Sequence, residues 1–96
     1  MSPLKKKKLN LIRQKLDKLD NSLINIIKKR TLSVDNLLKI KKLNKHIVDK
    51  NREKKIFKNI KKKSIKKKID PRITLKLWKA IISSYVEYQK KNIKKN

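Results

Sequence analysis

The apolar residues in the first part of the chain recur at helical spacing. Alternating steps of three and four residues separate Leu9, Ile12, Leu16, Leu19, Leu23 and Ile26. This spacing puts them on one face of an α-helix, and it predicts a helix over about 4–43. At 1.5 Å per residue such a helix is about 60 Å long, too long for a globule of this chain length. We therefore expect it either to bend or to pack along a second chain.

Two shorter helices are predicted in the second part of the chain. Asp49 is a residue type that favours the N-cap position, and a helix is predicted after it over about 50–66. Asp70-Pro71 combines an N-cap residue with a proline at the first helical position. A third helix is therefore predicted over about 71–90.

The composition favours an all-α fold and excludes several classes of site. The chain has no glycine and no cysteine, a single histidine, His46, and two prolines. A P-loop, a Rossmann fingerprint and the turns of a β-rich fold rely on glycine, so its absence argues against all three. Without cysteine there are no disulfides or thiolate metal sites. We expect one all-α domain over 1–96, with no metal and no cofactor.

The charge balance has two interpretations. Lysine and arginine number 32 against 7 acids, a formal net charge of +25, which by itself suggests nucleic acid or an anionic membrane as partner. However, the chain is saturated with lysine, isoleucine and asparagine, whose codons are rich in A and T. We interpret most lysines as solvated surface and expect no specific nucleic-acid or membrane partner. No apolar run is long enough for a membrane helix or a signal peptide, so we expect a cytoplasmic protein.

Two cations lie where the long helix would present apolar residues. Arg30 continues the apolar stripe, and Lys41 lies on the same side. Burying such charges costs several kcal/mol each unless they are paired, so an external anion is one expected partner. The alternative is that the stripe opens to solvent at Arg30 and that the Lys41 side chain reaches water.

In order and spacing, these residues resemble the small all-α chorismate mutases. The pattern has an arginine, a second arginine seventeen residues later, a lysine eleven further on, a D-x-x-R-E box and a glutamine near the end of the last helix. The corresponding residues are Arg13, Arg30, Lys41, Asp49-Lys50-Asn51-Arg52-Glu53 and Gln89. The resemblance covers about Leu9 to Gln89.

The resemblance implies an isomerase that converts chorismate to prephenate by a Claisen rearrangement, in phenylalanine and tyrosine biosynthesis. It implies that Arg13 and Arg30 hold the two substrate carboxylates. Lys41 and Gln89 would donate hydrogen bonds to the ether oxygen whose bond breaks. Such a reaction needs orientation and aimed donors rather than a nucleophile, a metal or a cofactor.

The same resemblance assigns roles to the D-x-x-R-E box and to one residue that departs from the family. Glu53 would bind the ring hydroxyl, aided by backbone near Asp49, and Arg52 would brace the box and the ring side of the substrate. Without the resemblance, Asp49 is an ordinary N-cap and Glu53 an acid favoured by the helix dipole. The family usually has a serine four residues before the glutamine, touching the ring carboxylate. Tyr85 stands there, and its hydroxyl would either substitute for the serine or crowd the pocket.

The spacing of the two arginines implies a homodimer. Arg13 and Arg30 are about 25 Å apart along one helix, too far to hold the same small molecule from one chain. If two long helices pair antiparallel, Arg13 of one subunit reaches the site that holds Arg30 of the other, and two-fold symmetry gives two identical sites.

Three alternatives stay open at the level of sequence. One is a related isochorismate–pyruvate lyase, although Glu53 suits the position of the hydroxyl on chorismate. A second is a basic helical module that binds nucleic acid, which explains the charge but not the placement of the arginines. A third is a non-catalytic relative or a subunit that needs a partner enzyme, which the tyrosine at position 85 leaves possible.

Overall fold

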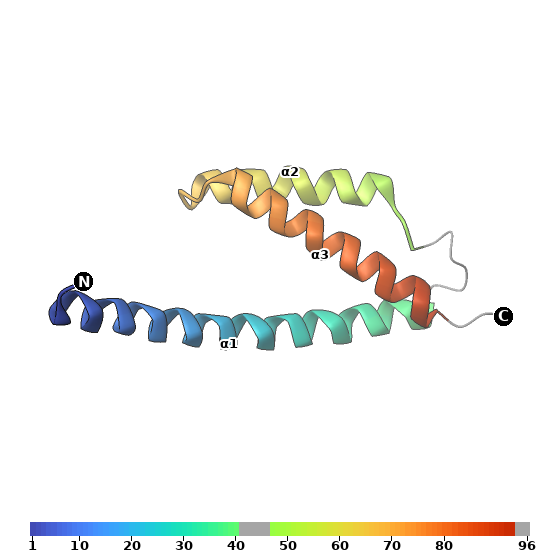
Figure 1. The fold of residues 1–96 in the computed structure, drawn as a ribbon. Helices are drawn as coiled ribbons and strands as arrows, with labels where there is room; N and C mark the ends of the chain where they lie inside the picture. The colour runs from blue at the N-terminus through green and yellow to red at the C-terminus, as the bar shows by residue number, and fades with distance from the viewer. Residues whose placement is uncertain (41–46, 94–96) are drawn as a thin grey trace. The chain divides into compact units, whose positions relative to one another are not determined.

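The structure, a computed structural model, describes residues 1–40 and 47–93. It contains three α-helices, α1 (Pro3–Ile40), α2 (Lys50–Lys66) and α3 (Pro71–Asn92) (Figure 1). No strand occurs in the described ranges. The all-α fold and the order of one long, one short and one medium helix are confirmed. The last residues of the predicted long helix, 41–43, lie outside the described residues.

The chain forms two compact units, Met1–Ser33 and Val34–Asn96. The first unit consists of the N-terminal part of α1 alone. Along the predicted apolar stripe, the five residues from position 12 to position 26 are between 53% and 63% exposed; they are Ile12, Leu16, Leu19, Leu23 and Ile26. The apolar face of this part of the helix is therefore exposed. No helix of the described residues is long and apolar enough to cross a membrane.

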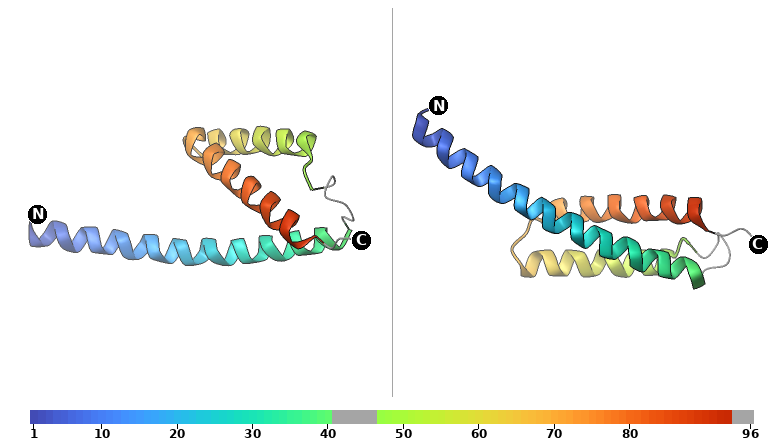
Figure 2. Two further views of the ribbon diagram at one scale, coloured as in Figure 1. Left: turned by 45° about the vertical axis from the view of Figure 1, so that its right-hand side comes forward. Right: turned by 90° about the horizontal axis from the view of Figure 1, so that it is seen from below.

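The second unit is built on a hairpin of α2 and α3. The two helices pack against each other, lie close at the turn that joins them and diverge towards their other ends (Figures 1 and 2). On α2, the covered positions recur at steps of three and four; they are Glu53, Ile56, Phe57, Ile60 and Ser64. This periodicity explains why one face of a helix that is otherwise rich in lysine can pack against α3.

The turn between α2 and α3 is a Schellman motif without glycine. The N–H of Ile69 donates to the carbonyl oxygen of Ser64 at 2.9 Å, and the N–H of Lys68 donates to that of Ile65 at 3.1 Å. Lys68 has a φ of 58°, the left-handed conformation that glycine usually adopts at this position. Because the chain has no glycine, a lysine takes this conformation.

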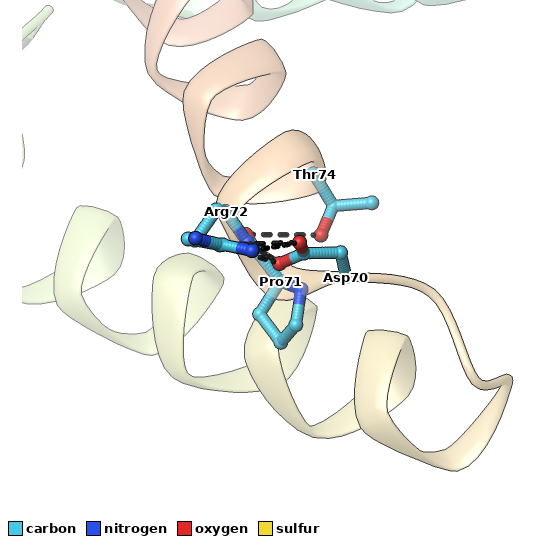
Figure 3. Close-up of polar contacts among 4 residues, drawn as sticks. All are labelled: Asp70, Pro71, Arg72 and Thr74. Atoms are coloured by element: carbon cyan, nitrogen blue, oxygen red, sulfur yellow. Dashed lines mark hydrogen bonds and ion pairs between the residues drawn. The ribbon is translucent and has the colours of Figure 1, made fainter.

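The start of α3 is fixed by local hydrogen bonds (Figure 3). The Asp70 side chain caps the helix by accepting from the N–H of Arg72 at 2.9 Å. The Arg72 guanidinium also reaches back to both carboxylate oxygens, with its Nη2 at 2.8 Å from Oδ2. This pair lowers the pKa of Asp70 and raises the pKa of Arg72. Pro71 occupies the first turn, where its missing N–H costs nothing.

The buried core of the described residues is small. Its apolar members are Val34, Ile47 and Ile93, and its polar members are Ser64 and Gln89. A chain of this size buries only about two-thirds of its unfolded surface, so little apolar burial is available to stabilise it. The exposed apolar face of α1 and the small core have the same physical consequence: many large apolar side chains of the described residues are in contact with water.

Candidate active site

The D-x-x-R-E box folds as the first turn of α2. Asp49 is the N-cap, and its carboxylate accepts from the N–H of Arg52 at 3.0 Å. Its carbonyl oxygen accepts from the N–H of Glu53, also at 3.0 Å. Capping by Asp49 fixes where the helix begins, and it thereby places Glu53 one turn into α2, on the side that packs towards α3.

Glu53 lines a cavity of about 480 Å³ between α2 and α3. Val48, Lys50 and Phe57 line it from the α2 side. The α3 side contributes Lys79, Ile82, Ser83, Val86, Glu87 and Lys90. The lining residues therefore come from the start of α2 and the middle and end of α3.

The cavity combines apolar walls with charged groups of both signs. Lys50 Nζ lies 3.5 Å from Glu53 Oε2, and the Glu53 side chain is 21% exposed whereas that of Lys50 is 79% exposed. The carboxylate of Glu53 is thus half-buried and suited to accept a hydrogen bond from a hydroxyl group. Lys79 and Lys90 add positive charge that would attract an anionic ligand.

Gln89 and Tyr85 lie together on α3. Gln89 is 6% exposed, and its Nε2 donates to the carbonyl oxygen of Tyr85 at 3.1 Å. The ring of Tyr85 meets that of Tyr88 edge to face, with centroids 6.4 Å apart and an interplanar angle of 88°. Neither Tyr85 nor Gln89 is among the residues that line the cavity beside Glu53.

A hydrogen bond joins α3 to the C-terminal part of α1. The hydroxyl of Tyr88 donates to Oδ1 of Asp35 at 2.6 Å, and both residues are half-buried. This hydrogen bond is the main cause of a raised pKa for Tyr88. Both residues belong to the second compact unit, so this contact is part of the same body as the α2–α3 hairpin.

Two further predicted site residues lie on α1. Arg13 and Arg30 are exposed residues of the first unit, on the same helix. Lys41 lies outside the described residues. The structure therefore forms two separate groups of predicted site residues. Asp49, Arg52 and Glu53 lie together at the start of α2, and Tyr85 and Gln89 lie together on α3.

Sequence reasoning missed several residues that line the cavity. Ser83, Glu87 and Lys90 follow one another at steps of four and three on α3, which is the spacing of one helix face. That signal was present in the sequence, but it is not distinctive in a chain with so many lysines. The Tyr88–Asp35 contact had no signal, because 53 positions separate the two residues.

The described residues contain no group of three or more histidine, cysteine or acidic side chains that could hold a metal ion. The chemistry available to the site is that of cations, a carboxylate, an amide and hydroxyl groups. These groups can bind, orient and donate hydrogen bonds to a small polar molecule.

Comparison with known proteins gives one match. A search of curated proteins and a search of solved structures each found no match. The model of the family described as chorismate mutase type II matches residues 12–90, a range that contains the arginines of α1, the D-x-x-R-E box and Gln89. The match covers most of the chain, so the protein belongs to the type II chorismate mutase family.

Proposed function

We propose that the protein is a chorismate mutase, an isomerase that converts chorismate to prephenate for phenylalanine and tyrosine synthesis. The observation that carries the proposal is the D-x-x-R-E box, which starts α2 so that Glu53 lines the cavity between α2 and α3. The match of residues 12–90 to the family supports the same reaction.

The rearrangement suits the side chains of this protein. It is a one-substrate pericyclic reaction, so it needs no nucleophile and no proton shuttle. It needs a dianion held in a compact reactive conformation and donors aimed at an oxygen that gains negative charge in the transition state. Arginine provides a planar pair of donors for the first task, and a lysine with an amide provides the second.

In the proposed mechanism, the guanidinium groups of Arg13 and Arg30 bind the two carboxylates. Lys41 and Gln89 donate to the ether oxygen as its bond to carbon breaks. One well-placed donor of this kind is worth about 3–4 kcal/mol in the transition state. Gln89 is neutral, so its donation does not depend on an acidic pH.

The D-x-x-R-E box and Tyr85 complete the proposed site. Glu53 accepts a hydrogen bond from the ring hydroxyl, with help from backbone near Asp49, and Arg52 braces the box. The half-buried position of Glu53 beside an apolar wall supports this role. Tyr85 takes the place of the usual serine near the ring carboxylate.

The proposed enzyme is a homodimer with two sites. The apolar face of α1, more than half exposed at Ile12, Leu16 and Leu19, supports pairing with a second copy, because covering it removes apolar surface from water. Antiparallel pairing of the α1 helices carries Arg13 of one subunit to the site of the other. Burying the apolar side chains on both copies would supply stability that the small core lacks.

The test is the loss of chorismate and the formation of prephenate by the purified protein. Arg30→Ala and Lys41→Ala are compared with Arg72→Ala and Lys62→Ala, which remove an exposed arginine of α3 and an exposed lysine of α2. We expect turnover by the native protein and by the two controls. Each of the first two substitutions lowers kcat/KM by roughly 10²-fold or more.

Two results contradict the proposal. A folded dimer that leaves chorismate unchanged rejects the mutase activity. The same protein is then offered isochorismate, and release of pyruvate would assign it to the lyase reaction instead. Equal activity of Arg30→Ala and Arg72→Ala would reject the assignment of Arg30 to substrate binding.

A further inference from the structure

The hydrogen bond between Tyr88 and Asp35 links the C-terminal part of α1 to the last turns of α3, which carry Gln89, one of the proposed ether-oxygen donors. Tyr88 directly precedes Gln89 on α3, and Asp35 lies six residues before Lys41 along the chain. The Oη–Oδ1 distance is 2.6 Å, short as expected when a hydroxyl donates to a carboxylate. Neither residue belongs to the pattern of two arginines, a lysine, the D-x-x-R-E box and Gln89 on which the resemblance rests.

The side chain of Tyr88 is held on two sides. Its hydroxyl is bound to Asp35, and its ring packs edge to face against Tyr85. Tyr85 in turn accepts, through its carbonyl oxygen, the hydrogen bond from the amide of Gln89. Tyr85 therefore meets both residues, Tyr88 through its ring and Gln89 through its backbone carbonyl oxygen.

The residues beside this link are among the few buried ones. Val34, next to Asp35, is 9% exposed, and Gln89, next to Tyr88, is 6% exposed. At the end of α3, Ile93 is 8% exposed and its N–H donates to the carbonyl oxygen of Gln89 at 2.8 Å. Burial on both sides restricts the directions in which the two helix ends can move.

We propose that Tyr88 and Asp35 are positioning residues: their hydrogen bond holds the last turns of α3, and with them Gln89, at a fixed register against the end of α1. This inference rests on the proposed chorismate mutase activity. Neither side chain touches the substrate. The pair acts by keeping the Gln89 amide aimed at the ether oxygen.

The expected effect on kcat and KM follows from the role of the Gln89 amide, the group that the pair positions. Gln89 acts on charge that develops only in the transition state, so its misplacement lowers kcat more than it raises KM. Misplacement of a reacting group by about 1 Å can cost up to roughly 10²-fold in rate. We expect Tyr88→Phe and Asp35→Asn each to lower kcat about tenfold or more, while KM changes less than about threefold.

The experiment measures kcat and KM of the native protein, Tyr88→Phe, Asp35→Asn and the double variant. Asp17→Asn, which changes an exposed carboxylate of α1, is the matched control and should keep the native kcat. Because both single changes remove the same bond, the double variant should be no slower than the slower single variant. Circular dichroism and melting temperature identify any variant that fails to fold.

A spectroscopic measurement tests the bond itself without activity. The chain has two tyrosines, so Tyr85→Phe leaves Tyr88 as the one whose ionisation is followed by ultraviolet absorbance. In that background Asp35→Asn should lower the pKa of Tyr88, because it removes the carboxylate that raises it. An unchanged titration would overturn the proposal at its first step.

The outcomes separate this proposal from the proposed function. If the native protein turns over chorismate but Tyr88→Phe keeps its kcat, the positioning role is wrong and the mutase activity stands. Losses that multiply in the double variant would mean that the two residues act independently, and they would also overturn the positioning role. If the folded native protein is inactive, both proposals fail together.

Discussion

The N–H of Ile69 donates to the carbonyl oxygen of Ser64 at 2.9 Å, and this hydrogen bond closes the turn that carries the chain from α2 into α3. The bond requires the intervening Lys68 to adopt a φ of 58°. For a residue with a side chain, this left-handed conformation costs about 1–2 kcal/mol. The turn that fixes the α2–α3 hairpin is therefore held in place at an energetic cost.

The first prediction is that Lys68→Gly stabilises the protein. Glycine removes the cost of the left-handed conformation but adds entropy to the unfolded chain, at about 0.5–1 kcal/mol. The expected net gain is about 0.5–1 kcal/mol, measured as a higher melting temperature.

Lys67→Gly is the matched control for that substitution. Lys67 has a φ of −91°, which any residue adopts, so glycine there brings only the entropic cost and should lower the melting temperature. If both glycine variants lower it equally, the conformation of Lys68 is not a source of strain.

The second prediction concerns the hydroxyl groups that join α2 to α3. Ser64 Oγ lies 2.6 Å from both the carbonyl oxygen of Ile60 and Thr74 Oγ1. If Ser64 donates its single hydrogen to Ile60, Thr74 is the donor to Ser64. Ser64→Ala, Thr74→Val and the double variant should give a coupling of about 0.5–1.5 kcal/mol in a double-mutant cycle.

Denaturant unfolding of the four proteins measures this coupling. Ser22→Ala is the control, because Ser22 is exposed on α1 and its hydroxyl bonds back to the carbonyl oxygen of Lys18 at 3.3 Å. This substitution should leave stability unchanged or slightly higher, since alanine is the better helix former. A coupling of zero between Ser64 and Thr74 would contradict the hydrogen bond between them.

The third prediction is an acid-dependent contribution from the cap of α3. Arg72 lowers the pKa of Asp70 in the folded protein. The contribution is therefore fully present above the ordinary carboxyl pKa and is lost as the pH falls through the lower, folded-state value. Asp70→Asn keeps a side chain that can cap the helix but has no charge to lose.

Melting temperatures at pH 7 and at pH 3 test this contribution. The native protein should lose more stability between the two values than Asp70→Asn does, whereas Asp17→Asn should behave like the native protein. An equal loss in all three proteins would mean that the Asp70–Arg72 pair makes no net contribution in solution, as is common for exposed ion pairs.

Some parts of the fold are determined by residues that are adjacent in the sequence. The starts of α2 and α3 were predictable because Asp49 and Asp70 cap the helix that directly follows them. The left-handed conformation of Lys68 was not predictable. Glycine usually marks such a position, but here the residue is one lysine among several neighbouring lysines. Residue type alone cannot distinguish Lys68 from its neighbours; the fold imposes its conformation.

The same distinction applies to the site. Glu53 was predictable because its place in the first turn of α2 depends on residues next to it in sequence. The cavity wall that α3 contributes depends on how two helices pack, and the Tyr88–Asp35 bond depends on a contact across 53 positions. Periodicity specifies which face of a helix is apolar, but not which residue of another helix it will meet. The roles of Arg13, Arg30 and Lys41 stay predictions.

The last prediction tests whether each site is shared between two subunits. In a homodimer built as proposed, Arg13→Ala and Lys41→Ala each inactivate both sites. In a mixed dimer of the two variants, one site receives both defects, and the other combines an intact Arg13 with an intact Lys41. Random mixing makes half of the dimers mixed, so the pool should recover about a quarter of native activity.

The two variants are unfolded together, refolded, and assayed for prephenate formation beside each variant refolded alone. The control mixes the Arg13→Ala variant with the double variant Arg13→Ala/Lys41→Ala. This mixture should recover no activity, since none of its dimers has an intact Arg13. Recovery in the first mixture alone would establish that Arg13 crosses the interface. If the first mixture stays inactive while the refolded native protein is active, Arg13 and Lys41 serve the same subunit, and the antiparallel pairing of α1 is wrong.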